Sequence, residues 1–216
     1  MRFVDANWRR LAVVALGAAA AGCASTPGAS SSGGTAAAVA APAPAVAPVN
    51  PQVQQAFDEA RRALVAGQAL QAEQGFRALT QSNPELGGPH ANLGLIHRQG
   101  GKLPEALPEL EAAVRASPKQ PAYLNQLGVA YRQAGRFDDA RDAYERAIAI
   151  APDYTAAQLN LAILYDLYLG DGKRALEQYE RYLALTPGGD ATVTKWVIDL
   201  RNRAPQKLAS NRQDKP

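Results

Sequence analysis

Cysteine and histidine are scarce in this chain of 216 residues, and their scarcity excludes several kinds of site. The single cysteine, Cys23, has no second cysteine with which to form a disulfide inside the chain. The two histidines, His90 and His97, are separated on a helix by a rise of about 10 Å, which is too far for two ligands of one metal ion. We therefore predict no metal site, and we expect both histidines to pack inside the fold.

The sequence also lacks the motifs and the charge excess of common enzymes and nucleic-acid-binding proteins. It has no phosphate-binding glycine loop, no HExxH and no GxSxG. From residue 23 onward the charges nearly cancel, because three of the 23 basic and one of the 20 acidic residues come earlier, leaving 20 against 19. Such a balance argues against nucleic acid as a partner. We predict no catalytic residue, no cofactor and no small-molecule substrate.

A long apolar run is absent as well. The apolar stretch at residues 11–21 has 11 residues, whereas a membrane-spanning helix needs roughly 20. It follows the basic pair Arg9 and Arg10. A short apolar run behind basic residues predicts an export signal and not a spanning anchor.

Residues 20–23, Ala-Ala-Gly-Cys, resemble the lipobox of bacterial lipoproteins. The resemblance implies that residues 1–22 are a signal peptide that is removed, and that the thiol of Cys23 carries a diacylglyceryl group. Because residue 24 is Ala and not Asp, the sorting rule of that family implies the outer membrane, with the chain on its periplasmic face. The alternative is cleavage by the ordinary signal peptidase after Ala21 or Ala24, which leaves Cys23 free or discards it.

Residues 23–50 have no apolar face of helical or strand period. They consist mainly of Ala, Gly, Ser and Pro, with prolines at positions 27, 42, 44 and 48. Such a segment buries too little surface to offset its ordering entropy. We predict a disordered tether with an average reach of roughly 30 Å.

From residue 51 onward, prolines mark a regular period. Pro84, Pro118 and Pro152 are 34 residues apart, and Pro187 follows after 35. In residues 121–152, apolar and small residues recur at helical spacing in two blocks, which predicts two short amphipathic helices joined by a tight turn. The pattern there, L-x2-L-G-x2-Y, then A-x3-Y, then P, resembles a tetratricopeptide repeat.

This resemblance implies an all-α fold, an α-solenoid of about four tetratricopeptide helix-turn-helix repeats followed by a C-terminal capping helix. The units are expected at about residues 53–84, 87–118, 121–152 and 155–187, the capping helix at 188–204, and a flexible tail at 205–216. Structural positions where helices should pack are Gly94, Gly128, Tyr131, Ala140, Tyr144, Ala162, Tyr165 and Ala175.

The geometry of the family also implies that the first helix of each unit faces a concave groove. Carried over by position, the partner-binding residues would be Asn92, Arg98, Asn125, Gln126, Arg132, Gln133, Asn160 and Asp166. Amides at the equivalent positions 92, 126 and 160 offer donors and acceptors to a peptide backbone, and arginines at 98 and 132 offer charge-assisted bonds to carboxylates. The alternative is that these side chains are only the solvated face of each helix.

One ligand of the family is not expected. Chaperone adaptors hold a terminal carboxylate with a particular Lys and Asn pair, and here Ala91 and Leu95 stand at the corresponding positions of the second unit.

The sequence shows no catalytic chemistry, and its repeats offer a surface that can bind another protein. We therefore predict that the chain is a lipid-anchored protein–protein interaction scaffold of the bacterial envelope. The plan of lipobox, linker and repeats is similar to that of tetratricopeptide lipoproteins that help assemble pilus or secretion secretins. Adaptors for peptidoglycan hydrolases or for an envelope motor complex share this plan. The alternatives of another class are an unanchored periplasmic repeat protein and an enzyme subunit whose active residues are not recognisable.

Lipidation of Cys23 predicts where the protein is found after cell fractionation. The wild-type chain should sediment with the outer membrane, and Cys23→Ala should move to the soluble periplasmic fraction because it cannot carry the lipid. Immunoblots of separated membranes measure both. Sedimentation of Cys23→Ala with the outer membrane would show that lipid on Cys23 is not the anchor.

Overall fold

The computed structural model describes residues 50–213, which belong to one compact unit of the chain, Ala47–Pro216. The predicted signal peptide, Cys23 and the tether up to residue 49 lie outside the described residues. Residues 50–213 form nine α-helices and no strand, which confirms the predicted all-α class. The helices are α1 (Pro51–Val65), α2 (Ala69–Ser82), α3 (Gly87–Gln99), α4 (Leu103–Ala116), α5 (Pro121–Gln133), α6 (Phe137–Ile150), α7 (Thr155–Leu167), α8 (Gly172–Ala184) and α9 (Ala191–Gln213).

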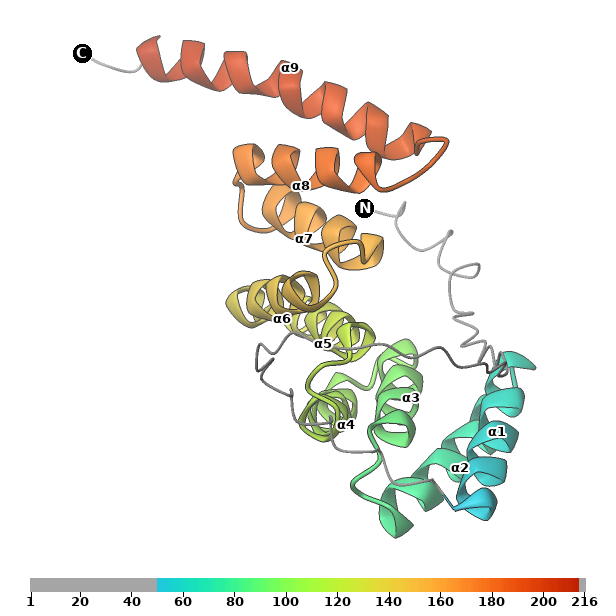
Figure 1. Ribbon diagram of the computed structural model, residues 1–216. Helices are drawn as coiled ribbons and strands as arrows, with labels where there is room; N and C mark the ends of the chain where they lie inside the picture. Colours follow the sequence, from blue (N-terminus) through green and yellow to red (C-terminus); the bar gives the residue numbers. More distant parts are fainter. Residues whose placement is uncertain (1–49, 214–216) are drawn as a thin grey trace, which may run out of the picture. The chain divides into compact units, whose positions relative to one another are not determined.

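Consecutive helices form hairpins that stack in chain order (Figure 1). α1 packs on α2, α3 on α4, α5 on α6 and α7 on α8, and the second helix of each hairpin contacts the first helix of the next. Direct contacts also join α3 to α5 and α5 to α7. We call α3, α5 and α7 the inner row, and α4, α6 and α8 the outer row. This is the solenoid arrangement that the 34-residue period predicts.

The turn inside a hairpin depends on a glycine in the left-handed backbone region. Gly135 has a φ of 76°, which residues with a Cβ rarely adopt. The amide of Arg136 then donates to the carbonyl of Tyr131, five residues earlier, at 2.9 Å and closes α5. In the fourth hairpin the amide of Asp171 bonds the carbonyl of Tyr165, six residues earlier, at 2.9 Å. The turn therefore absorbs the one residue by which that unit is longer.

Small residues let the two helices of a hairpin approach closely. A Cβ added to Gly128 would lie 2.5 Å from Cε1 of Tyr144, and one added to Gly94 would lie 2.7 Å from Cγ of Leu110. Carbon atoms that are not bonded pack at about 3.5–4.0 Å. Each glycine therefore provides the space into which the opposing side chain packs, and Tyr144 and Leu110 are fully buried.

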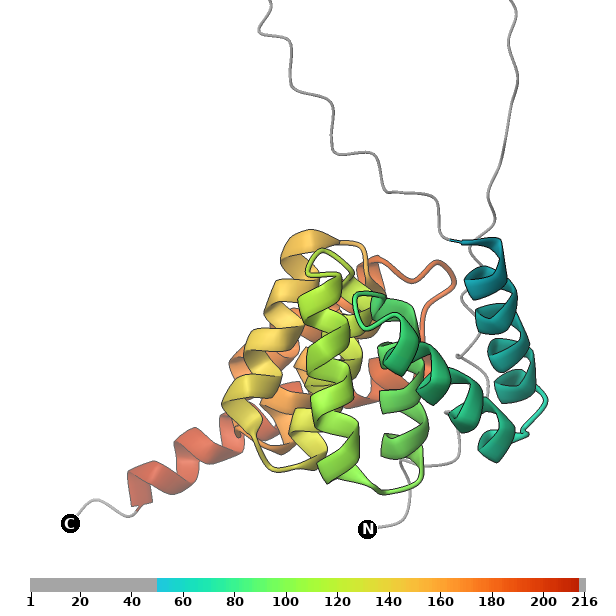
Figure 2. The same ribbon diagram turned by 90° about the horizontal axis from the view of Figure 1, so that it is seen from below.

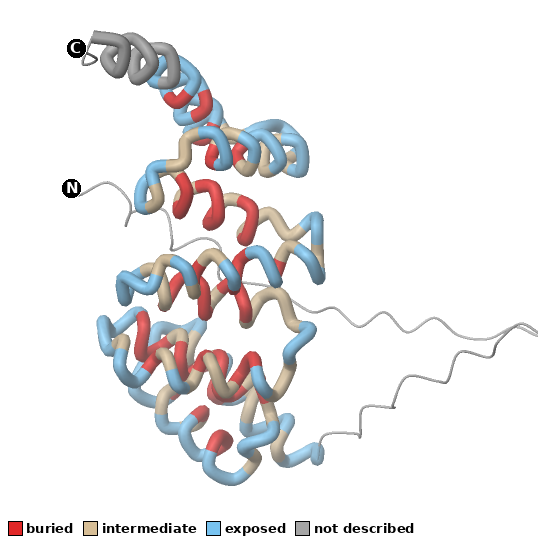
Figure 3. The backbone as a smooth tube through the Cα atoms, turned by 90° about the vertical axis from the view of Figure 1, so that its left-hand side faces the viewer, coloured by how far each residue is buried: buried red, intermediate tan, exposed pale blue. Residues whose placement is uncertain are grey.

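The other predicted packing positions lie in the same interior. Ala140, Ala162 and Ala175 have no exposed surface, and Tyr165 is buried. Tyr131 is half-buried and its hydroxyl donates to Oε1 of Glu111 at 2.9 Å. Figure 3 shows that buried positions recur along the helices, whereas the turns are mostly exposed.

α9 covers the end of the stack. Oδ1 of Asp190 accepts hydrogen bonds from the amides of Thr192 and Val193, at 2.9 and 3.1 Å, and so caps the helix. Val193, Val197 and Leu200 are buried in a cluster with residues of α7 and α8. The capping helix therefore shields apolar surface that the fourth hairpin would otherwise expose.

α9 is longer than the sequence predicts. The capping helix was expected to end at 204, with a flexible tail beyond it, whereas α9 continues to Gln213 and extends past the other helices (Figure 2). Pro205 lacks an amide hydrogen and disfavours a helix interior, but residues 206–213 include several good helix formers. No helix among residues 50–213 has the length and apolar character to cross a bilayer.

The contact between Gly128 and Tyr144 predicts an overpacking effect. Gly128→Ala should lower the free energy of unfolding by about 1–3 kcal/mol, because the new methyl group enters the space of a fully buried ring. Urea unfolding of both proteins measures the difference.

Gly100→Ala is the matched control. Gly100 has an ordinary φ of −79°, and its added Cβ would meet atoms no closer than 3.5 Å. Equal destabilisation by the two substitutions would contradict the close approach of α5 and α6.

Candidate functional site

The residues predicted to bind a partner all lie on the inner row. α3 carries Asn92 and Arg98, α5 carries Asn125, Gln126, Arg132 and Gln133, and α7 carries Asn160 and Asp166. Their exposure differs: Gln133 is exposed, Arg98, Asn125 and Asn160 are buried, and the others are half-buried.

The amides do not form one ladder of equivalent contacts. Nδ2 of Asn160 donates to Oδ1 of Asn125 at 2.9 Å, and both residues are buried, with 6% and 4% of their surface exposed. Nδ2 of Asn92 donates to the backbone carbonyl of Gly88 at 2.9 Å. The buried pair joins α5 to α7, so these two amides hold neighbouring hairpins together. Partner binding by the amides stays a prediction.

The arginines lie close to one another on α3 and α5. The guanidinium of Arg98 donates to Oε1 of Gln126 at 3.2 Å. Burial lowers the pKa of Arg98, and the positive charge of Arg132 lowers it further, whereas Tyr144 acts in the opposite direction. Arg132 lies over the ring of Tyr168, 5.4 Å from its centroid, and its Nη1 is 3.4 Å from the Tyr168 hydroxyl. The inner row therefore concentrates positive charge at this point.

Tyr144 extends from the outer row toward these arginines. Its ring lies across Gly128, and burial raises the pKa of its hydroxyl, while the charges of Arg132 and Arg98 oppose that rise. Nε of Arg132 has no hydrogen-bond partner within the described part of the chain, but the side chain of Arg132 makes a hydrogen bond to the Tyr144 hydroxyl. The guanidinium of Arg132 therefore contacts the hydroxyls of both Tyr144 and Tyr168.

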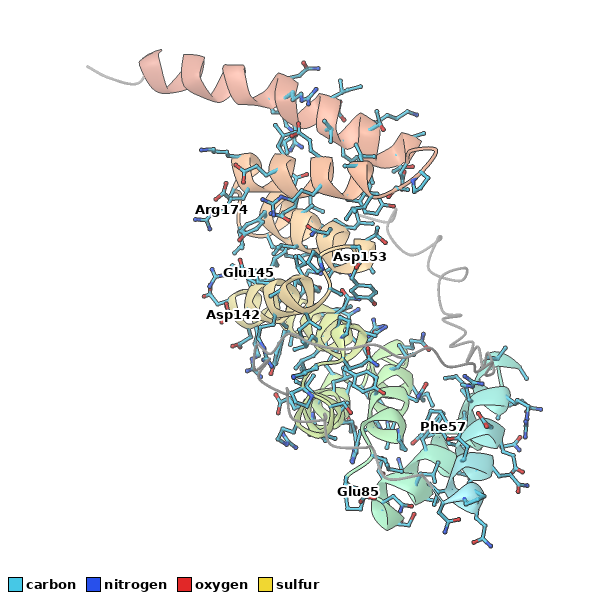
Figure 4. All side chains as sticks on the ribbon, viewed as in Figure 1. Phe57, Glu85, Asp142, Glu145, Asp153 and Arg174 are labelled. Carbon is cyan, nitrogen blue, oxygen red and sulfur yellow. The ribbon has the colours of Figure 1, made fainter. Side chains whose placement is uncertain are left out.

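Two charged side chains on the outer side of the stack, Glu145 and Arg174, have partners within the protein. Oε1 of Glu145 accepts the hydroxyl of Tyr165 at 3.0 Å, and the guanidinium of Arg174 lies over the same ring, 5.6 Å from its centroid. Figure 4 shows Glu145 and Arg174 on the same side of the stack. Glu145 and Arg174 are both exposed to solvent and both contact Tyr165.

The sequence did not single out Leu167 and Tyr168, at the end of α7, as a binding surface. Leu167 is 61% exposed and Tyr168 is 43% exposed. The residues equivalent to Leu167 in the second and third units are Gln99 and Gln133. The sequence therefore contained a signal for this surface: Leu167 is apolar, whereas the equivalent residues of the neighbouring units are polar.

Both histidines pack as predicted. His90 and His97 are 8% and 6% exposed. Nδ1 of His90 lies 2.6 Å from Oε2 of Glu109, and its Nε2 lies 3.1 Å from the carbonyl of Pro84. Residues 50–213 contain no group of three His, Cys, Asp or Glu side chains placed to hold a metal ion.

Stacked hairpins with a continuous inner row define an α-solenoid of helical repeats. The family model of the tetratricopeptide repeat matches residues 57–121, 91–155 and 125–190. The chain belongs to the tetratricopeptide repeat family, as the pattern of residues 121–152 predicts. No curated protein matches the chain.

Solved structures of the same fold come from several proteins. pilF of Pseudomonas aeruginosa is 18% identical over 74% of this chain and 72% of its own, with a TM-score of 0.64. YrrB, described as a tetratricopeptide repeat protein with an unusual peptide-binding site, is 19% identical over 68% of this chain and 74% of its own, with a TM-score of 0.59.

An enzyme also contains this fold. The O-GlcNAc transferase of Thermobaculum terrenum is 22% identical over 61% of this chain, with a TM-score of 0.57. The match spans 26% of the transferase. At these identities the likeness concerns the fold alone.

The buried amide pair predicts a structural role for Asn160. Asn160→Ala should lower the free energy of unfolding by about 1–3 kcal/mol, because it leaves Oδ1 of the buried Asn125 without its donor. Gln133→Ala, on the same row but exposed, should change it by less than about 0.5 kcal/mol. Chemical unfolding measures both, and equal effects would show that the pair contributes nothing.

Proposed function

We propose that this chain is a lipid-anchored interaction scaffold of the bacterial envelope that binds a partner protein through its inner row. Cys23 carries the lipid and holds the chain at the periplasmic face of the outer membrane. The repeats supply the binding surface, and the bound partner belongs to an envelope complex that is being assembled, of the pilus or secretion secretin type. No catalytic activity is part of this proposal.

One surface carries the proposal: the patch formed by Leu167, Tyr168 and Arg132. Leu167 and Tyr168 are exposed, and Arg132 stacks on the Tyr168 ring. Tyr168 also packs against Phe137, with ring centroids 5.1 Å apart, so its ring is held in place before a partner arrives. Tyrosine and arginine are the residue types that most often dominate binding energy at protein interfaces.

The relatives support surface recognition as the task of the fold. YrrB is described as having an unusual peptide-binding site. Tetratricopeptide repeats offer extended surfaces to protein ligands. The plan of lipobox, tether and repeats favours the envelope for this chain. Adaptors for peptidoglycan hydrolases or a motor complex have the same plan, so the class of partner complex is the part of the proposal that experiment must decide.

Site-specific photo-crosslinking tests the proposed surface in the native envelope. A benzophenone amino acid placed at position 167 should yield a crosslinked partner, because Leu167 lies in the patch. The same amino acid at position 70 is the matched control, since Leu70 is 70% exposed but lies on α2, away from the inner row.

Leu167→Glu should weaken capture of the crosslinked partner about tenfold or more, as expected for a charge placed in an apolar contact. Leu70→Glu should leave capture unchanged. The same partner crosslinking equally from positions 167 and 70, or no partner from 167, would contradict the proposed surface.

A further inference from the structure

α1 carries two charged residues, Glu59 and Arg62, at positions that are apolar and buried in the later units. There the preceding hairpin packs over both positions. The equivalent residues, each at most 8% exposed, are Leu93, Leu127 and Leu161 for Glu59, and Ile96, Ala130 and Leu164 for Arg62. In the first unit Glu59 and Arg62 are exposed. They mark the side of α1 on which the stack has an open end.

The direction of Phe57 shows which side of α1 this is. A Cβ added to Gly88 of α3 would lie 3.1 Å from the Phe57 ring, so the Phe57 side of α1 faces the next hairpin. At about 100° per residue, Glu59 and Arg62 lie roughly 160° and 140° around the helix from Phe57. The two charges therefore point away from the rest of the stack.

Glu59 and Arg62 are not paired with each other. Their spacing of three residues allows an ion pair on a helix, and Asp58 and Arg61, at the same spacing, form one at 3.4 Å. Glu59 and Arg62 take part in no ion pair among residues 50–213. Oε1 of Glu59 accepts only an amide hydrogen bond, from Gln55 at 2.9 Å. Both charges can therefore pair with a second molecule.

The charged residues belong to a seam along α1, which we define as Gln55, Glu59, Arg62 and Ala66. These four residues are exposed and follow one another at intervals of four, three and four, which is the spacing by which one helix packs along another. A groove of about 390 Å³ between α1 and α2 runs beside the seam. It leaves room for side chains that flank the seam of an opposing helix.

We propose that this seam binds α1 of a second copy of the chain, with the two helices antiparallel about a twofold axis. When Glu59 of one copy lies opposite Arg62 of the other, the symmetry places Arg62 opposite Glu59 as well. The same register places Gln55 opposite Ala66 twice. The seam is thus complementary to itself, as a twofold interface requires. The second copy covers the positions that a preceding hairpin covers in the later units.

Sedimentation velocity of the purified full chain tests the dimer over a series of protein concentrations. Reducing conditions are used so that Cys23 cannot join two copies. The wild type should form a dimer as the concentration rises. Glu59→Arg and Arg62→Glu should each weaken that dimer about tenfold or more, because each converts both ion pairs into contacts between like charges.

Mixing the two variants tests the antiparallel register. Glu59→Arg presents two arginines along the seam, and Arg62→Glu presents two glutamates. An equimolar mixture should therefore form a heterodimer with about the affinity of the wild-type dimer, although each variant alone is weakened. The double variant Glu59→Arg/Arg62→Glu exchanges the two charges and should dimerise by itself.

Arg61→Glu is the matched control. It makes the same change of charge as Arg62→Glu at the next residue, which is exposed but lies outside the seam, so it should dimerise as the wild type does. Because all three substituted residues are exposed, the urea midpoints of the variants, measured on monomers, should stay close to that of the wild type. A weakened dimer then reflects a changed surface and not a lost fold.

Three results would overturn the proposal: a wild type that stays monomeric at every concentration, a dimer that neither reversal weakens, and mixed variants that do not associate. The second result is the one expected if another surface joins the copies. The inner row takes no part in this interface. A partner crosslinked from position 167 would therefore leave the proposed function standing if the dimer fails.

Discussion

The structure depends on one recurring contact, in which a side chain from the second helix of a hairpin packs across a small residue of the first. Leu110 crosses Gly94 and Tyr144 crosses Gly128, at distances that leave no room for a methyl group. This contact sets how closely the helices of a unit approach, and repetition of the unit builds the stack. The same contact places a polar group on the inner row. Because the Tyr144 ring crosses Gly128, its hydroxyl lies near Arg132 of α5.

The outer side of the stack and the inner row carry different kinds of side chain. Outer-side charges such as Glu145 and Arg174 have protein partners, and so contribute to solubility and local packing. The inner row combines the exposed Leu167 and Tyr168 with Arg132, whose side chain contacts the hydroxyls of Tyr144 and Tyr168. Apolar surface, a tyrosine ring and an arginine in one place are common features of surfaces that bind protein ligands.

The sequence predicted those features that depend on the repeat period. The helices follow the prolines at intervals of 34 and 35 residues and the packing positions Gly128 and Tyr144, which are periodic signals in the sequence. Contacts between units depend on the rotation from one hairpin to the next, which the sequence does not reveal. The hydrogen bond of Asn160 to Asn125 and the ion pair of Arg203 with Asp166 are of this kind. For the same reason, equivalent positions such as 92, 126 and 160 make different contacts although the pattern treats them alike.

A double-mutant cycle measures the central contact most directly. It combines Gly128→Ala with Tyr144→Ala and compares the free energies of unfolding of the two single variants, the double variant and the wild type. If the Tyr144 ring fills the space beside Gly128, the methyl group added by Gly128→Ala should cost almost nothing once the ring is gone, giving a coupling energy of about 1–3 kcal/mol. Additive effects, with the same cost of Gly128→Ala in both backgrounds, would contradict the account.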